Sequence, residues 1–186
     1  MLYIIFAFTL PYVASLLSEF LYLVSLPVTV IDAIATFTSM VFYIIGFTQL
    51  ISESKNFATA RIIEIVLLIF ELGRFIFEKE ISDIFILNAI QPITVVALCY
   101  MKYLIGLGVA DMEKNHRLKL GSEELIKALK VQIALMLSSM LCSFISMKIM
   151  FVLNIVFILG IASVIAEFFV IFRLCKTYRQ TFNIKE

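Results

Sequence analysis

Long apolar stretches, repeated six times along the chain, constrain the fold more than any other feature of this sequence. A transmembrane α-helix needs about 20 mostly apolar residues to cross the hydrocarbon core of a bilayer. Six stretches meet that requirement: residues 2–25, 29–51, 58–78, 83–109, 124–146 and 150–175. The chain is 62% hydrophobic, whereas soluble domains are roughly 45–50% apolar. The sequence therefore predicts an all-α integral membrane protein, with residues 1–186 forming a single bundle of six transmembrane helices.

Basic residues are distributed unevenly between the two ends of the predicted helices. Eleven lysines and arginines lie at the end that carries residues 52–60, residues 110–123 and the C-terminal tail, against Lys79 and Lys148 at the other end. Cytoplasmic loops of membrane proteins carry such an excess of Lys and Arg. The sequence therefore predicts a multi-pass protein of the cell inner (plasma) membrane with both termini in the cytoplasm. Residues 110–123, which include His116, are predicted to be the one sizeable loop.

Tyrosines have to replace tryptophan as interfacial anchors, because the sequence contains no Trp. Tyr and Trp are the residues enriched at the two membrane–water interfaces. We therefore expect five tyrosines to lie at interfaces together with Lys and Arg: Tyr3, Tyr22, Tyr43, Tyr103 and Tyr178.

Two segments about 60 residues apart resemble each other. The segment YIIGFTQLISESKN occupies residues 43–56, and YLIGLGVADMEKN begins at Tyr103. Both are predicted at the cytoplasmic ends of even-numbered helices. This similarity suggests three helical hairpins arranged as parallel repeats, although chance resemblance between apolar segments is an equally simple interpretation.

The stretch RIIEIVLLIFELGRFIFEKE, residues 61–80, combines a membrane span with seven charges. At 100° per residue its charges from position 61 to position 78 fall on one face about 140° wide, and the opposite face is apolar. The spacing allows Arg61–Glu64 and Glu71–Arg74 to form i,i+3 ion pairs. An unpaired charge at the bilayer centre costs about 3 kcal/mol on insertion scales. These groups must therefore be paired, protonated or hydrated.

Helical rise divides the polar residues of all six spans into two layers. The outer layer is acidic, because Asp32 also belongs to it and Arg74 is its one base. We predict that an outward-facing polar cavity is formed there by Glu19, Glu71, Arg74, Asn88 and Gln91. The inner layer also contains Gln132, and its acids and bases are predicted to balance. Its charged members are Glu64, Lys102, Lys130 and Glu167.

Two prolines within predicted helices free backbone carbonyls. Pro92 cannot donate a hydrogen bond to residue 88, and Pro11 cannot donate one to Ala7. Within a membrane such carbonyls need partners from neighbouring helices or water. The Pro92 site coincides with the outer polar layer, which adds to the case for a cavity there.

Function is only partly constrained by the sequence. A formal net charge of +1 argues against a nucleic-acid partner, since such binding is dominated by basic charge. The chain has no catalytic, nucleotide-binding or metal-binding motif, so we expect neither enzymatic activity nor a metal or cofactor. Intramembrane charges favour a transport module, or the membrane subunit of a transporter, that handles a small solute or cation.

Two other interpretations are compatible with the same sequence. The first is a membrane-embedded regulatory, sensory or accessory protein that acts through a protein partner or as a homo-oligomer in the lipid bilayer. Its basic cytoplasmic surface and short external loops favour this alternative. Alternatively, the intramembrane polar residues only hold helices together, typically at about 0.6 kcal/mol per interhelical contact.

Overall fold

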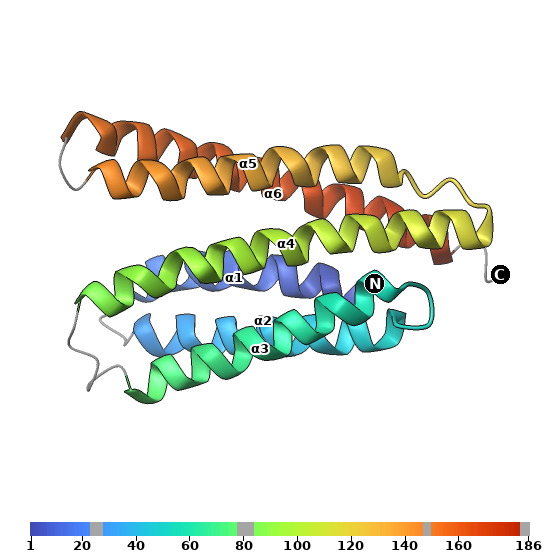
Figure 1. Cartoon of the computed structure of the whole chain (residues 1–186), viewed down its shortest axis with the longest axis horizontal. Helices are drawn as coiled ribbons and strands as arrows, with labels where there is room; N and C mark the ends of the chain where they lie inside the picture. The colour runs from blue at the N-terminus through green and yellow to red at the C-terminus, as the bar shows by residue number, and fades with distance from the viewer. Residues whose placement is uncertain (23–27, 78–83, 147–149, 183–186) are drawn as a thin grey trace.

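The structure, a computed structural model, is built from six α-helices (Figure 1). It describes the backbone of residues 1–22, 28–77, 84–146 and 150–182, and the side chains within them except at positions 16–22, 28–32, 77, 84–91, 144–146, 150–153 and 182. The helices are α1 (Leu2–Tyr22), α2 (Val28–Leu50), α3 (Lys55–Phe77), α4 (Ile84–His116), α5 (Ser122–Ser146) and α6 (Met150–Phe182). The predicted all-α class is confirmed.

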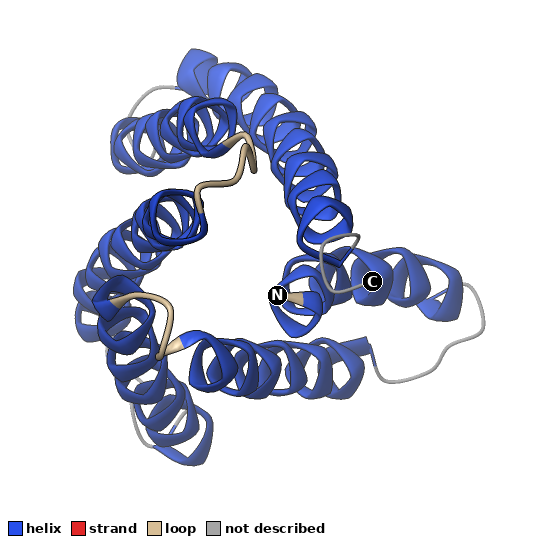
Figure 2. Ribbon diagram, turned by 90° about the vertical axis from the view of Figure 1, so that its right-hand side faces the viewer, coloured by secondary structure: helices blue, strands red, loops and turns tan. Residues whose placement is uncertain are grey.

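The helices run side by side and close into a ring (Figures 1 and 2). In the described part of the chain, each helix packs against its neighbours in sequence, and α1 also packs against α6. The α2–α3 and α4–α5 connections lie at one end of the bundle, together with the N-terminus and the C-terminal end of α6 (Figure 1). We call this the terminal end. Helix α3 packs equally against α2 and α4, so α3 and α4 do not form a separate hairpin. The hypothesis of three repeated helical hairpins stays a prediction.

Four helices contain a stretch that is long and apolar enough to cross a membrane: Ala33–Leu50, Pro92–His116, Ser122–Ser143 and Asn154–Thr181. In α1 the described apolar helix, Leu2–Ser15, is shorter than a full span. The described part of α3 does not qualify, because every stretch of 18 residues within it contains at least three charged residues. These four helices fit a multi-pass membrane protein, and the six predicted spans are not all confirmed.

The predicted 110–123 loop is mostly helix, which corrects the sequence analysis. Helix α4 continues to His116 and ends in a left-handed turn at Arg117, whose φ is 55°. The Leu118 N–H then donates to the carbonyl of Glu113 at 3.0 Å, as in a Schellman cap. Because glycine usually occupies this left-handed position, the sequence gives no clear stop signal.

Helix α5 begins with a cap that α4 supplies. The Ser122 backbone N–H donates to the carboxylate of Glu113 at 2.9 Å. Gly121, with φ of 74°, makes the turn into the helix, and its carbonyl accepts from the Leu125 N–H at 3.1 Å. The α4–α5 connection is therefore short and fixed at both ends.

The turn before α3 is attached to α4 by polar contacts. The Ser54 hydroxyl accepts from the Asn56 N–H at 3.0 Å and caps α3. The Ser54 hydroxyl also donates to the carboxylate of Asp111, and the Asn56 side-chain amide donates to it at 2.8 Å. A Cβ at Gly108 would lie 2.6 Å from the Phe57 ring. The first turn of α3 therefore packs closely on α4, where only glycine fits.

Proline and glycine also determine how α1 packs on α2. The Ala7 carbonyl, which Pro11 leaves free, accepts a 2.7 Å hydrogen bond from the buried Ser39 hydroxyl of α2. The expectation that a neighbouring helix satisfies this carbonyl is therefore confirmed. A Cβ at Gly46 would come within 2.8 Å of Ile4, so α1 and α2 approach closely there as well.

Candidate functional site

Polar side chains from all six helices, four buried and two partly buried, lie in the interior of the bundle. We call this group the central polar cluster, and its members are Tyr12, Tyr43, Glu64, Lys102, Gln132 and Glu167. The ring arrangement explains the convergence, because each helix turns one side toward the same interior.

The central polar cluster contains an ion pair between Lys102 and Glu167. The Lys102 Nζ atom of α4 is 2.9 Å from Glu167 Oε1 of α6, and Lys102 is only 6% exposed. The ammonium group also lies 5.1 Å from the centre of the Phe8 ring and 3.9 Å from the sulfur of Met136. A buried charge is tolerated when it is paired, and here α1, α5 and α6 all contribute to holding the Lys102 ammonium.

Glu167 has further partners from α1 and α5. Its second carboxylate oxygen accepts a hydrogen bond from the Gln132 side-chain amide, and the Tyr12 hydroxyl interacts with the same carboxylate. The fully buried Tyr43 of α2 is within electrostatic range of both Glu167 and Glu64. Glu167 is therefore the centre of a network that joins five of the six helices.

Glu64 of α3 is buried without a matching charge. Its residue exposure is 1%, and its Oε2 atom has no hydrogen-bond partner in the described structure. The i,i+3 spacing also allows a pair with Arg61, but no such ion pair is found among the described side chains, and Arg61 Nε is buried without a partner as well. Arg61 lies one helical turn away, so a rotamer change would bring the two groups together.

Gln132 has the second unsatisfied acceptor of the cluster. Its exposure is 0%, and its Oε1 atom has no donor within the part of the chain that the structure describes. A buried polar group without a partner costs about 1–3 kcal/mol. Such a group in a native fold calls for a bound water, ion or proton. Both unsatisfied atoms in the cluster are acceptors, so the missing partner is a hydrogen-bond donor or a cation.

The predicted inner charge layer is only partly assembled. Glu64, Lys102 and Glu167 are interior, as is Gln132, but Lys130 is exposed on the surface of α5. The balance of charges at this depth, which counted Lys130, stays a prediction. The interior part of this layer contains two acids and one base, and Glu64 is the acid without a counter-charge.

The predicted outer cavity is described only at two of its five residues. The Arg74 guanidinium pairs with the Glu71 carboxylate at 2.7 Å, as the i,i+3 spacing predicted. In this pair Glu71 is largely buried and Arg74 is 53% exposed at the side chain. The side chains of the other three candidates lie outside the described residues: Glu19, Asn88 and Gln91.

Two tyrosines are the members of the cluster that sequence reasoning missed. Tyr43 was expected at a membrane interface, but it is buried and stacks on Phe47, with ring centroids 5.7 Å apart. Tyr12 was not singled out at all. A phenol in an apolar helix looks the same at an interface and in a core, so neither could be placed from its own helix. The distance of Tyr43 from the end of α2 at Leu50 is the one available signal, since it places the ring roughly 10 Å inside the helix.

The helices define the class of this protein. With four helices suited to crossing a membrane, it is a multi-pass helical membrane protein. The sequence matches no family model and no curated protein, and the structure matches no solved structure. The described residues contain no group of His, Cys, Asp and Glu side chains suited to hold a metal ion. What the protein does must therefore be argued from the central polar cluster.

Proposed function

We propose that the chain is a six-span transport module, with both termini cytoplasmic, that takes up a proton or a small monovalent cation at the central polar cluster. The observation that carries this proposal is Glu64, a carboxyl group that is 1% exposed and has an oxygen without a partner. Ionisable residues inside a membrane are candidates for a functional site, and ion pathways and proton relays are among the functions that they mark.

The chemistry of the neighbours supports a cation over an anion. Glu64 and Gln132 both present buried acceptor oxygens without donors, whereas the ammonium of Lys102 is already paired with Glu167. Among the members of the central polar cluster, an anion would meet two carboxyl groups and one base that is already paired. A proton or a monovalent cation would instead satisfy Glu64 without disturbing the Lys102–Glu167 pair.

Arg61 offers Glu64 a second partner and therefore a second state. In the first state the Glu64 carboxyl group holds the transported cation, and Arg61 lies one turn nearer the terminal end. In the second state the cation has left, and a rotamer change pairs Glu64 with Arg61. The two states differ in the partner of a single buried carboxylate, which couples release of the cation to a local rearrangement of α3.

Ligand-dependent thermal stability tests this proposal. The full chain in detergent is unfolded at several pH values, and separately with Na⁺ or K⁺ replacing choline at constant ionic strength. A cation present at 100 times its dissociation constant stabilises the folded state by about 2.7 kcal/mol. We therefore expect a lower pH, Na⁺ or K⁺ to raise the midpoint temperature of unfolding. The isosteric Glu64→Gln variant is expected to lose that response. Glu123→Gln, at a surface carboxylate, serves as the matched control, and an unchanged response in Glu64→Gln contradicts the proposal.

The hollow at the terminal end favours the alternative of a regulatory or sensory protein that acts through a partner. It has a volume of about 390 Å³ and is lined by Glu53 and His116, among others. The His116 Nε2 atom lies 2.6 Å from Glu53 Oε2, so the rim carries exposed polar groups. Cross-linking in native membranes through Gln49→Cys, at a residue that lines this hollow, tests the alternative. Recovery of a stoichiometric partner protein would support it. Recovery of the chain alone would count against it.

A further inference from the structure

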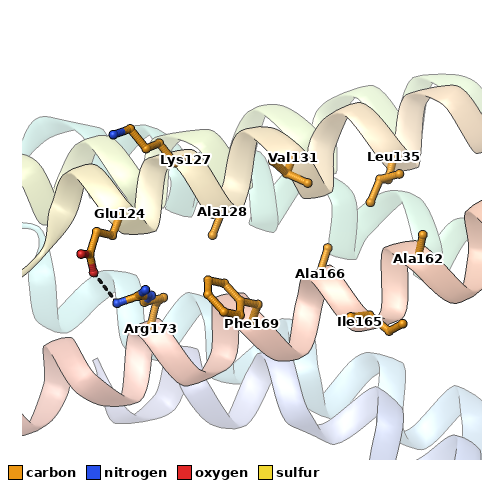
Figure 3. Close-up of a pocket in the computed structure, with 10 residues that line it drawn as sticks. All are labelled: Glu124, Lys127, Ala128, Val131, Leu135, Ala162, Ile165, Ala166, Phe169 and Arg173. Carbon is orange, nitrogen blue, oxygen red and sulfur yellow. Dashed lines mark hydrogen bonds and ion pairs between the residues drawn. The ribbon is translucent and has the colours of Figure 1, made fainter.

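A groove lies between α5 and α6 and is lined by side chains of both helices (Figure 3). Its volume is about 580 Å³, and its lining is mostly apolar. Val131 and Leu135 of α5 face Ala162 and Ala166 of α6 across it (Figure 3). The two alanines leave room that larger side chains would fill, so the groove is a consequence of small residues on α6.

Charged groups gather at one end of the groove. Arg173 of α6 pairs with Glu124 of α5 (Figure 3), and its guanidinium lies 5.1 Å from the centre of the Phe169 ring. Lys127 is at the same end, where its exposed ammonium pairs with Glu123 at 2.7 Å on the surface of α5. These contacts hold the Arg173 guanidinium in place, and its Nε atom still has no partner within the described residues.

The length of the groove matches one leaflet of a bilayer. From Glu124 to Leu135 the axis of α5 rises about 16 Å, and α6 covers the same length from Ala162 to Arg173. Half of the hydrocarbon core of a bilayer is about 15 Å thick. The charged end therefore lies at headgroup depth when the apolar end reaches the middle of the membrane.

From this match we propose that the groove binds an anionic phospholipid of the leaflet at the terminal end. One acyl chain lies along Val131, Leu135 and Ala166, and the phosphate lies at the charged end of the groove, where the flexible Lys127 side chain can turn toward it. Charge favours an anionic headgroup, because exposed Lys130 and Lys176 also lie near this level and Glu123 and Glu124 offset only two of these four bases. Arg and Lys are the residues that bind phosphate oxygens in proteins.

Native mass spectrometry of the purified full chain tests the proposal. Phosphatidylglycerol and phosphatidylcholine with identical acyl chains are added at equal concentration. We expect one phosphatidylglycerol per chain to be retained in preference to phosphatidylcholine. Lys127→Gln is expected to weaken phosphatidylglycerol binding about fivefold and to leave phosphatidylcholine unchanged. Its matched control is Lys114→Gln, at an exposed lysine of α4 that does not line the groove.

A second variant tests the acyl-chain part of the site. Ala166→Phe places a ring in the groove and is expected to reduce retention of both lipids. Val164→Phe, on the other side of α6, adds the same bulk without filling the groove and is expected to retain both. Unfolding midpoints measured without added lipid show whether each variant is folded. If Ala166→Phe does not fold, Lys127→Gln still tests the proposal.

Three results would overturn the proposal. They are equal retention of the two lipids by the natural chain, retention of neither, and unchanged selectivity in Lys127→Gln. A fourth comes from Val131→Cys in liposomes. If two copies cross-link through this cysteine, the groove is an interface between copies of the chain and holds no lipid.

Discussion

Replacing Glu167 with Gln removes the charge that compensates Lys102 while keeping the volume of the side chain. At the observed distance of 2.9 Å the two charges attract by about 6 kcal/mol for an effective dielectric constant of 20. Desolvation of both groups offsets much of this attraction. Removing one partner of such a buried pair typically costs about 3–5 kcal/mol, and we expect Glu167→Gln to lower the free energy of unfolding by that amount.

Removing the other charge, in Lys102→Met, is expected to lower the free energy of unfolding by less. The reason is that Lys102 and Glu167 have different additional partners. In Lys102→Met, the Glu167 carboxylate keeps the Gln132 amide and the Tyr12 hydroxyl. In Glu167→Gln, the Lys102 ammonium keeps only the Phe8 ring and the sulfur of Met136 as other close partners in the described structure. The structure therefore predicts an asymmetry between the two single variants.

Unfolding in mixed detergent micelles of both single variants and the double variant measures the interaction as a double-mutant cycle. We expect Lys102 and Glu167 to be coupled by about 2 kcal/mol, within the range for residues in contact. The double variant should then be more stable than the sum of the single effects implies. A coupling energy below about 0.5 kcal/mol, or equal losses in the two single variants, would refute the reasoning.

Three further predictions concern the fold. Ser39→Ala should lower the free energy of unfolding by about 1–3 kcal/mol, because the buried Ala7 carbonyl loses its donor; denaturant unfolding measures the loss, and no change would contradict it. Gly108→Ala should destabilise the bundle by about 1–3 kcal/mol, because the added methyl meets the Phe57 ring at 2.6 Å; a midpoint equal to that of the natural chain would be inconsistent with this packing. Arg117→Gly should raise the free energy of unfolding by about 1 kcal/mol, because φ is 55° at this residue and glycine adopts that conformation without strain. A lower thermal midpoint in this variant would argue against the left-handed cap.

Helix positions were largely predictable from the sequence, and helix ends were less so. Apolar runs mark where a chain can lie in lipid, so the predicted spans coincide with the cores of the six helices. They do not mark where a helix stops in water. Helices α4 and α6 continue from the predicted residues 109 and 175 to His116 and Phe182, since neither extension contains a proline or another strong breaker.

The candidate site was predictable by depth and not by direction. Helical rise placed Glu64, Lys102 and Glu167 at a similar level, and the structure brings Lys102 and Glu167 into contact. The same rise placed Lys130 in that layer, although it is exposed on α5. Which side of a helix faces inward depends on its packing against neighbours, and a weakly amphipathic helix does not show this in its own sequence.

The proline prediction succeeded because it rests on covalent chemistry alone. Pro11 lacks an N–H in any environment, so the need of the Ala7 carbonyl for a partner follows from the sequence. That the partner is Ser39 does not follow, because it depends on the register between α1 and α2. Local chemistry was therefore predictable, and contacts between helices were not.

Cation movement through the reconstituted protein tests the central claim most directly. The full chain is placed in liposomes that contain a pH-sensitive dye, and a potassium diffusion potential is imposed, with Na⁺ present or absent. We predict dye-detected proton flux or Na⁺ accumulation in liposomes with the natural chain, its loss in Glu64→Gln, and its retention in Glu123→Gln. Flux in Glu64→Gln equal to that of the natural chain would contradict the assignment of Glu64 as the group that binds the cation.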